Sequence, residues 1–516
     1  YATITGNDPV GLSHSTSLSN GLVLELQQAA AATVFNETSH LDYPWQTTSS
    51  NQNPLGFNPI PDPSNSSRLR ETFSAATIYD VNNGEYPKMF VKEFEEGKVV
   101  SVFIESYSLS NGNVQPPSVS LWSYNEQGGN AIFGEMKEDL RIPLQGNFSH
   151  FNTCIPHVFK HEIYVYCTQY GSESSNLSLG NNNSVFIEQF QDILIHWDNN
   201  GSLQSFWIPH VNSTSNSFVT SLRSQYSTSY VYRSQFLDDN IYLLLRGSSG
   251  DELNFPNGTL ECRDYGTCHI LAKINLNGTL EGYITSSKYY PHMGRHSPCD
   301  MEKFHIANSS SINFRTGNDD CTIKGTSGNT ISYTKTGNNG YFIGFDTDLV
   351  FIDSIIENPC SSLFISDAVI LPEKSYFTVT GGHDTPCNNI RYDWIPQNIT
   401  TSYSAYTSIV SKLNNGTIDW SYSWYGSETS DDFSLLVISY GIMWLGPRNN
   451  FFWEEIDNRV SPYLGPTPGN PAWSPVFSHE GEWLDVISGR GCSSQASISR
   501  PIIYSEIQTG FTCAYY

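Results

Sequence analysis

The chain has 516 residues, of which 51 are acidic and 26 basic, giving a formal charge of -25, yet only 15% of its residues are charged. Such an acidic surplus disfavours nucleic acid and anionic membrane surfaces as partners. With 30 tyrosines and 11 tryptophans, the surface is of the kind that stacks on sugars or packs against protein. No apolar run reaches the roughly 18 residues of a membrane-spanning helix, so no membrane span is expected. The start at Tyr1, without signal-peptide features, leads us to expect a processed mature product.

Residues 1–75 are expected to form an N-terminal arm and linker. Residues 1–5 and 22–26 alternate in the manner of a strand, and residues 29–35 are compatible with a short helix or second strand. Residues 43–67 are rich in Pro, Asn and Ser and cannot build a core of their own. We expect the arm to add a strand to an exposed sheet edge, either of its own chain or of a neighbouring subunit.

One hairpin pattern recurs between residues 76 and 490. An alternating apolar run leads into an Asn-Gly or Glu-Gly step, and a second alternating run follows, which predicts a β-hairpin. The steps 201 to 278, 278 to 416 and 416 to 481 are 77, 138 (twice 69) and 65 residues, so a unit of about seventy residues repeats. The turn glycines are Gly201, Gly278, Gly416 and Gly481.

A second landmark, an apolar run ending in glycine, precedes each of these turns. The glycines of the two landmarks are separated by 30, 31, 35 and 35 residues, for the runs at 163–171, 241–247, 376–381 and 442–446. A fifth copy is expected at 312–317 with its turn at 344–349, and a weaker first copy at 99–105 with its turn at 126–129. Together the landmarks predict about six units.

Units of this length, made only of strands and turns, bury both faces when they stack radially as blades. We therefore predict an all-β fold, a β-propeller of about six blades, or seven if the arm supplies one. Its domains are the arm and linker (1–75), the propeller (76–490) and a disulfide-closed C-terminal segment packing on it (491–516).

The phrase YFTVTG at residues 376–381, followed by IVSKLNNGTIDW at 409–420, resembles the blade repeat of secreted tandem-repeat β-propeller proteins. In that family the first phrase is an inner strand and the second forms the last hairpin of a blade. The resemblance implies the fold and does not specify an activity.

The ten cysteines are even in number, which predicts disulfides and an oxidising, extracellular environment. Two pairs are symmetric about predicted turns at 160–161 and 373–374, and facing positions on a hairpin lie within disulfide reach. The expected bridges join neighbours in sequence: Cys154–Cys167, Cys262–Cys268, Cys299–Cys321, Cys360–Cys387 and Cys492–Cys513. A zinc site is the alternative, but no Cys-X-X-Cys motif is present.

Twelve Asn-X-Ser/Thr sites predict surface N-glycosylation. Three of them lie on predicted hairpin tips, where a glycan costs no packing. The acceptors are Asn36, Asn65, Asn147, Asn176, Asn182, Asn200, Asn212, Asn257, Asn277, Asn308, Asn398 and Asn415.

No catalytic residue is predicted. A glycosidase needs two carboxylates on facing strands, whereas the acidic pairs 238–239, 319–320 and 431–432 lie in turn-like contexts. No Gly-X-Ser-X-Gly elbow is present, although the members of a Ser–His–Asp site can be far apart in sequence.

No cofactor or metal is predicted either. His292, His296 and His305 lie close together in sequence, and residues 198–202 and 346–348 offer oxygens for Ca²⁺. The 12-residue calcium loop with its terminal glutamate is missing, so loop histidines and tight turns are the simpler interpretation and calcium the weaker alternative.

Three classes of function fit these features. The preferred one is a non-catalytic secreted glycoprotein, a structural or adhesive subunit of an extracellular, surface-attached assembly, which self-associates head-to-tail through its arm into a filament. The first alternative is a receptor- or carbohydrate-binding propeller head with a glycan ligand, as in six-bladed viral attachment glycoproteins, whose sialic-acid site motifs are missing here. The second is a secreted polysaccharide-active enzyme.

Overall fold

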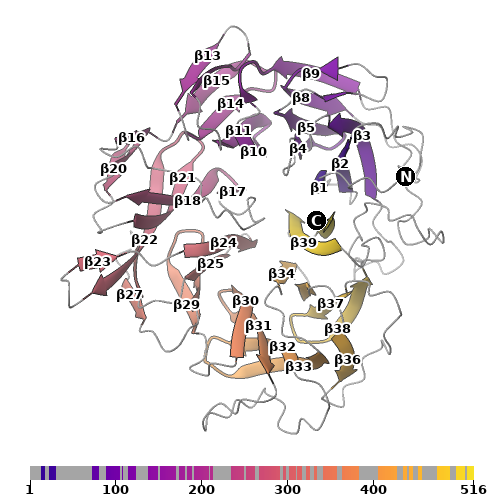
Figure 1. Ribbon diagram of the computed structural model, residues 1–516, viewed down its shortest axis with the longest axis vertical. Helices are drawn as coiled ribbons and strands as arrows, with labels where there is room; N and C mark the ends of the chain where they lie inside the picture. Colours follow the sequence, from indigo (N-terminus) through magenta and orange to yellow (C-terminus); the bar gives the residue numbers. More distant parts are fainter. Residues whose placement is uncertain are drawn as a thin grey trace. The chain divides into compact units, whose positions relative to one another are not determined.

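The computed structural model shows an all-β protein (Figure 1), with no α-helix among the residues that it describes. It describes residues 13–17, 23–30, 72–80, 89–104, 107–108, 114–123, 137–148, 151–169, 174–180, 183–188, 191–208, 210–212, 234–248, 252–261, 267–290, 295–297, 301–308, 311–316, 321–325, 330–333, 341–356, 363–382, 405–426, 434–438, 441–445, 451–455, 473–488, 496–505 and 508–515.

The chain divides into two compact units. Unit 1 comprises Tyr1–Pro59 and Arg68–Tyr283, and unit 2 comprises Ile60–Ser67 and Ile284–Tyr516. Among the described residues, six successive sheets contain the same antiparallel four-strand meander.

Unit 1 holds the first three of these sheets. The first is β4 (Met89–Glu95), β5 (Lys98–Phe103), β8 (Ser118–Ser123) and β9 (Lys137–Pro143); the second is β10 (Phe151–Phe159), β11 (Glu162–Gln169), β14 (Ile193–Trp197) and β15 (Leu203–Trp207); the third is β17 (Ser234–Leu237), β18 (Asn240–Ser248), β21 (Thr267–Asn275) and β22 (Leu280–Tyr290). Two small sheets accompany them, β12 (Ser175–Ser178) with β13 (Ser184–Ile187), and β16 (His210–Asn212) with β19 (Glu252–Phe255) and β20 (Gly258–Glu261).

Unit 2 holds the other three. The fourth sheet is β24 (Met301–Asn308), β25 (Ser311–Thr316), β28 (Tyr341–Phe345) and β29 (Phe351–Ile356); the fifth is β30 (Leu363–Ile370), β31 (Lys374–Gly382), β32 (Ala405–Leu413) and β33 (Ile418–Gly426), extended by β36 (Phe451–Glu455); the sixth is β34 (Ser434–Ile438), β35 (Gly441–Leu445), β37 (Trp473–Ser478) and β38 (Trp483–Ser488). The unit-2 part of β22 pairs with β26 (Cys321–Gly325), which pairs with β27 (Thr330–Tyr333), and β23 (Arg295–Ser297) also pairs with β22. The C-terminal hairpin is β39 (Ala496–Ser505) and β40 (Gln508–Tyr515).

The second strand of each meander is largely buried wherever its side chains are described, as its apolar sequence predicts. On β11, Ile163 and Val165 pack in one cluster with the first sheet, while Tyr164 and Tyr166 pack in another with the third sheet. In unit 2, a comparable cluster joins the fifth and sixth sheets through residues such as Trp420 and Phe477. The runs predicted around 99, 163, 241, 312, 376 and 442 are the second strands β5, β11, β18, β25, β31 and β35.

Polar side chains join successive sheets within each unit. In unit 2 the Asn313 Oδ1 atom accepts a hydrogen bond from the backbone N–H of Ile370 at 2.8 Å, and Asp367 Oδ2 accepts one from the N–H of Leu435 at 2.8 Å. In unit 1, His157 Nε2 lies 2.6 Å from the carbonyl oxygen of Asp238. Each bond satisfies a backbone group of the next sheet. Ile370 and Leu435 are buried, so their N–H groups would otherwise remain unpaired at an energetic cost.

Five hairpins close with one type of turn. The first residue of the turn accepts a hydrogen bond from the N–H three positions on and donates to the carbonyl four positions on, in the turns that begin at Asp198, Asn275, Asp346, Leu413 and Ser478. The fourth residue has positive φ in each: Gly201 (78°), Gly278 (82°), Leu349 (61°), Gly416 (90°) and Gly481 (86°). This is the three-residue hairpin loop with a left-handed residue, and it confirms the four glycine turns predicted from the sequence. In the fifth copy, leucine occupies the left-handed position.

Three of the four turn glycines lie against the preceding sheet. A methyl group on Gly278 would be 2.5 Å from the Trp207 ring, and one on Gly481 would be 2.5 Å from the Trp420 ring. The same change at Gly201 would bring the methyl group to 3.0 Å from Leu140 and Ile142 of β9. Glycine is therefore required both for its conformation and for the close approach of a side chain.

The N-terminal strands form a separate sheet in unit 1. β1 (Ser13–Ser17) pairs with β2 (Val23–Ala30), β2 pairs in parallel with β3 (Thr72–Asp80), and β6 (Tyr107–Ser108) and β7 (Val114–Gln115) complete it. The strand predicted around residues 22–26 is thus confirmed, and it continues through Ala30. Residues 1–5 and the proline-rich stretch 43–67 lie outside the described part of the chain.

Cys154 and Cys167 form the predicted disulfide, with a Cα–Cα distance of 4.0 Å. They face each other in the β10–β11 register, and both are buried. The two-residue turn between these strands has positive φ at Lys160 (51°) and His161 (60°), at the position predicted from cysteine symmetry. For the other four predicted bridges the side chains lie outside the described residues, so these bridges remain predictions.

The disulfide predicts a defined loss of stability. Replacing Cys154 and Cys167 together by alanine should lower the free energy of unfolding by about 2–4 kcal/mol, because the bridge restricts the unfolded chain. Urea unfolding measures the loss, and peptide mapping without reductant should show the 154–167 link. A peptide joining Cys167 to Cys262 would contradict the assignment.

The glycine turns supply a matched pair of substitutions within unit 2. Gly416→Ala should lower the free energy of unfolding by about 1–2 kcal/mol, because an alanine at φ 90° is strained. No described atom lies within 4 Å of the added methyl group, so no clash adds to this loss. Gly481→Ala should cost a further ~1–3 kcal/mol because its methyl group overlaps Trp420. Denaturant unfolding followed by tryptophan fluorescence compares the two, and equal losses would argue against the docking of the turn on Trp420.

Candidate functional site

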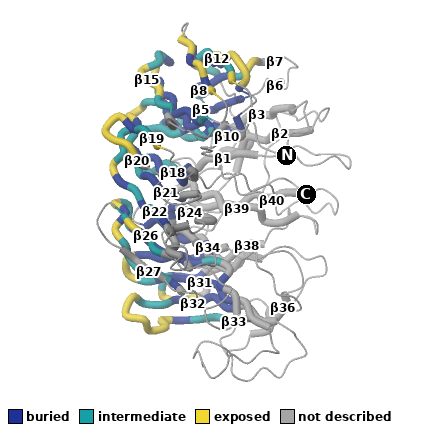
Figure 2. Tube along the Cα trace, turned by 60° about the vertical axis from the view of Figure 1, so that its left-hand side comes forward, coloured by how far each residue is buried: buried dark blue, intermediate teal, exposed yellow. Residues whose placement is uncertain are grey.

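The hairpin tips are the part of the molecule that faces solvent in a repeated way. Figure 2 shows exposed residues concentrated at turns and outer strands such as β15 and β20, whereas β5 and β18 are largely buried. Asn200, Asn277 and Asn415 are all exposed and occupy the third position of their turns. An asparagine side-chain amide is therefore presented at the same point of three different sheets.

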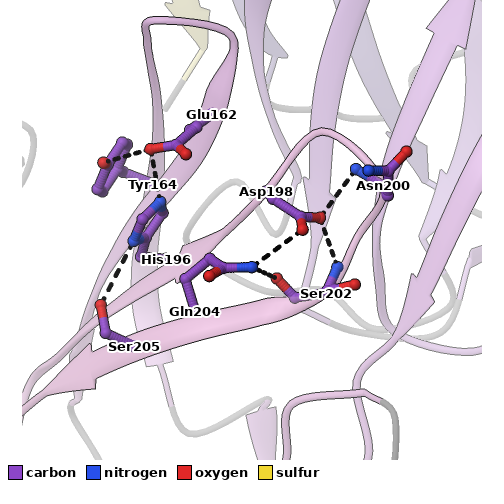
Figure 3. Close-up of polar contacts among 8 residues, drawn as sticks. All are labelled: Glu162, Tyr164, His196, Asp198, Asn200, Ser202, Gln204 and Ser205. Carbon is purple, nitrogen blue, oxygen red and sulfur yellow. Dashed lines mark hydrogen bonds and ion pairs between the residues drawn. The ribbon is translucent and has the colours of Figure 1, made fainter.

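The first residue of each turn fixes the tip. Asp198 Oδ1 accepts hydrogen bonds from the N–H groups of Asn200 and Ser202 at 2.9 and 2.8 Å (Figure 3), and Asn275 Oδ1 accepts those of Asn277 and Thr279, both at 3.0 Å. These bonds involve only the backbone N–H groups of Asn200 and Asn277. Within the described residues, the side-chain amides of these two asparagines make no hydrogen bond. Such side-chain-to-backbone bonds are the reason that Asp, Asn and Ser favour turns.

The third tip is held by a different side-chain acceptor. Its turn begins with Leu413, which has no side-chain acceptor, and Asn415 takes over that role. Asn415 Oδ1 accepts hydrogen bonds from the N–H of Thr417 at 3.0 Å and from its hydroxyl at 2.6 Å. The asparagine and threonine of the acceptor motif thus contact each other directly.

The structure describes the remaining glycosylation motifs to different extents. Asn147, Asn176 and Asn257 are exposed as well. Asn212 and Asn308 lie in β16 and β24 without described side chains, and Asn36, Asn65, Asn182 and Asn398 lie outside the described residues. Glycosylation at each remains a prediction.

A polar cluster on the second sheet contains the residue types of a hydrolytic relay (Figure 3). Glu162 Oε2 accepts a hydrogen bond from the Tyr164 hydroxyl at 3.1 Å and lies 2.9 Å from His196 Nε2, and Ser205 Oγ lies 3.4 Å from His196 Nδ1. The last distance exceeds the roughly 2.6–3.2 Å of a nucleophile paired with its base.

Packing explains this cluster better than catalysis. The His196 and Tyr164 rings stack at 4.2 Å, on the face of the sheet that packs against the third sheet. Burial, reinforced by Glu162, raises the pKa of the Tyr164 hydroxyl above its usual range, so this group stays a hydrogen-bond donor. Sequence reasoning missed the cluster because Glu162 and His196 meet only through strand register.

A second cluster, in unit 2, holds the β37–β38 turn. The carbonyl of His479 accepts hydrogen bonds from Trp420 Nε1 at 3.1 Å and from Lys374 Nζ at 2.8 Å, and His479 Nδ1 lies 2.7 Å from the Tyr376 hydroxyl. Lys374 also pairs with Asp419 at 3.0 Å. These groups hold the fifth sheet against the turn of the sixth, which is a structural role.

The acidic and metal candidates from the sequence have turn roles where they are described. The carbonyls of Asp238 and Asp239 accept hydrogen bonds from His157 and from the N–H of Leu276. Asp346 Oδ1 accepts from the N–H groups of Asp348 and Val350 at 2.9 and 2.8 Å. Within the described residues no group of three or more His, Cys, Asp or Glu could hold a metal ion. The pairs 319–320 and 431–432 and the side chains of His292, His296 and His305 are not described.

No helix in the described part of the chain is long and apolar enough to cross a membrane. In comparisons with known proteins, no protein-family model matches the chain, and no curated protein matches it.

His157 predicts a specific dependence of stability on pH. Burial lowers its pKa from 6.5 to about 4, outweighing the bond to Asp238, and its ring stacks on Phe236 with centroids 4.6 Å apart. Between about pH 6.5 and 4 the unfolded chain binds a proton that the folded protein does not, so the free energy of unfolding should fall as the pH drops through this window.

His157→Gln keeps a donor for the Asp238 carbonyl and removes the titration. Its free energy of unfolding should therefore depend less on pH between 6.5 and 4 than that of the wild type, while the difference at pH 8 gives the packing cost alone. Parallel pH profiles for the two proteins would contradict the assignment.

Proposed function

We propose that the six meander sheets are blades of a β-propeller, and that the chain is a non-catalytic secreted glycoprotein, a structural or adhesive subunit of an extracellular assembly. The observation that carries the proposal is the repeated docking of a hairpin turn on the preceding sheet, at Gly201, Gly278 and Gly481. One unit of sequence makes one kind of contact with its neighbour, as in proteins whose role is to present a rigid surface.

Burial supports the propeller. The second sheet buries both of its faces, one against the first sheet and one against the third. When sheets stack face to face along a chain, the first and the last sheet each keep one exposed face. These two faces are buried only if the first and last sheets pack against each other in a ring. A closed propeller buries those faces as well, and the arm strands β1–β3 are the candidates for an additional blade.

The use of polar side chains supports a structural role. Glu162, His196 and Tyr164 in unit 1, and Lys374 and His479 in unit 2, have the chemistry of an active site, but their bonds hold strands and turns together. The exposed tips carry acceptor asparagines at corresponding positions. Glycans there would cover the turns and leave the other surfaces for contact with partners.

The Cys154–Cys167 disulfide supports a secreted protein. Both sulfur-bearing side chains are buried, which fits a structural bridge formed in an oxidising compartment. The acceptor motifs at Asn200, Asn277 and Asn415 belong to the same compartment, because N-glycans are added along the secretory route.

We propose that the arm joins subunits. Residues 31–71, 41 in number, connect β2 to β3, and β2 pairs with β3 of the same chain. A neighbour's β2 presents the same backbone groups, so the pairing can be exchanged between subunits without any new contact. Exchange in one direction is head-to-tail and need not close, and it then yields a filament.

Deleting residues 1–40 tests this exchange. The expected result is a folded monomer in place of the polymer formed by the full chain, measured by light scattering and electron microscopy. Unchanged assembly would contradict the proposal. A synthetic peptide of residues 1–40 provides a test that does not depend on folding of the deletion variant, since excess peptide should shorten full-length filaments by occupying β3. Filaments indifferent to the peptide would count against exchange.

A further inference from the structure

The hairpin of β19 and β20 in unit 1 carries an acceptor motif whose asparagine differs from those at the other tips. Phe255 and Gly258 pair across a two-residue turn, and Asn257 is the second residue of that turn. Asn257 is exposed, as are Asn200 and Asn277. By sequence and exposure alone, all three are equivalent acceptors.

The side chain of Asn257 makes a two-bond pairing with the first residue of β22. Asn257 Nδ2 donates to the Leu280 carbonyl at 2.8 Å, and Asn257 Oδ1 accepts from the Leu280 N–H at 3.0 Å. One side chain thus satisfies both backbone groups of Leu280, as a neighbouring strand would. The threonine of the motif is engaged too, because the Thr259 hydroxyl donates to Asn254 Oδ1 at 2.8 Å.

This pairing and a glycan compete for the same position on the amide. When both bonds go to one residue, the donated N–H must lie on the same edge of the amide as Oδ1. Glycosylation joins Nδ2 to C1 of the first sugar, breaks the C1–O bond to the pyrophosphate of a lipid-linked oligosaccharide, and releases one amide proton. In the trans secondary amide that results, the sugar lies on the Oδ1 side and the remaining N–H points to the opposite side.

We propose that Asn257 is a structural amide that carries no glycan in the folded protein, whereas the tips at Asn200, Asn277 and Asn415 carry them. The latter three amide nitrogens make no hydrogen bond within the described residues, and their tips are held by backbone N–H groups or by Asn415 Oδ1. Asn257 clamps the β19–β20 hairpin to the first residue of β22. The inference rests on the proposed secreted glycoprotein.

Site occupancy tests the proposal directly. The full chain is secreted from a eukaryotic cell line and digested to peptides. Peptide N-glycosidase then removes the glycans in ¹⁸O-water, and mass spectrometry identifies the labelled peptides. The expected result is the ¹⁸O label at Asn200, Asn277 and Asn415 and unmodified asparagine at Asn257. A label at Asn257 equal to that at Asn277 would overturn this inference and leave the proposed glycoprotein intact. Loss of the label at all four positions would overturn both.

A stability comparison tests the clamp apart from the glycans. In the wild type and both variants the glycans are first trimmed to a single N-acetylglucosamine by an endoglycosidase, which controls for sugar effects on stability without converting asparagine to aspartate. Asn257→Asp removes the donor and places a carboxylate against the Leu280 carbonyl, and should lower the Tm by about 1–3 °C. Asn277→Asp, at an exposed tip whose amide nitrogen makes no hydrogen bond within the described residues, should leave the Tm nearly unchanged. Equal shifts in the two variants would show that Asn257 holds nothing in place.

Discussion

The contact between a left-handed turn glycine and the sheet before it is the constraint on which the rest of the structure depends. At Gly278 and Gly481 the space that a side chain would fill is occupied by a tryptophan ring of the preceding sheet. A glycine is the one residue that both adopts this φ without strain and allows the ring so close. Because the turn is fixed to its own strands by backbone bonds, docking the turn also sets the position of the strands behind it.

Stacking of this kind removes water from both faces of a sheet, and this has a consequence for polar groups. A hydroxyl, carboxylate or ring nitrogen between two sheets is favoured to have a partner there, since an unpaired buried polar group costs about 1–3 kcal/mol. The Tyr166 hydroxyl donates to Asp192 Oδ2 at 2.8 Å, and burial raises the pKa of this tyrosine well above its usual range. Buried Asn313 plays the equivalent part between two sheets of unit 2. These buried polar residues therefore stabilise the packing by hydrogen bonds between strands and between sheets.

The same constraint leaves the tips of the turns free to vary. A tip needs one acceptor for its two backbone N–H groups, which Asp198, Asn275, Asp346 and Ser478 provide by different chemistry. The third residue of the turn is not needed for packing, and here three of them are acceptor asparagines. A scaffold that fixes its core through glycine and tryptophan and displays modifiable tips suits a protein whose function lies in its surface.

The sequence by itself determined the features that depend on a few consecutive residues. The glycine turns, the second strand of each meander and the Cys154–Cys167 bridge were predictable because turn chemistry, strand alternation and hairpin register are local. Leucine at the left-handed position 349 was not predictable from propensity, since the neighbouring turn bonds of Asp346 hold it there.

Only the tertiary structure decided which distant side chains meet. Tyr376 and His479 are 103 residues apart, and Asn257 and Leu280 belong to different sheets, so their contacts depend on the stacking of whole sheets. The two-bond clamp at Asn257 shows the difference most clearly. Its motif reads like any other acceptor, and only the strand beside it makes its amide unavailable. Local patterns follow from the conformational preferences of single residues, whereas such contacts follow from register and burial, which the chain acquires only when its sheets pack.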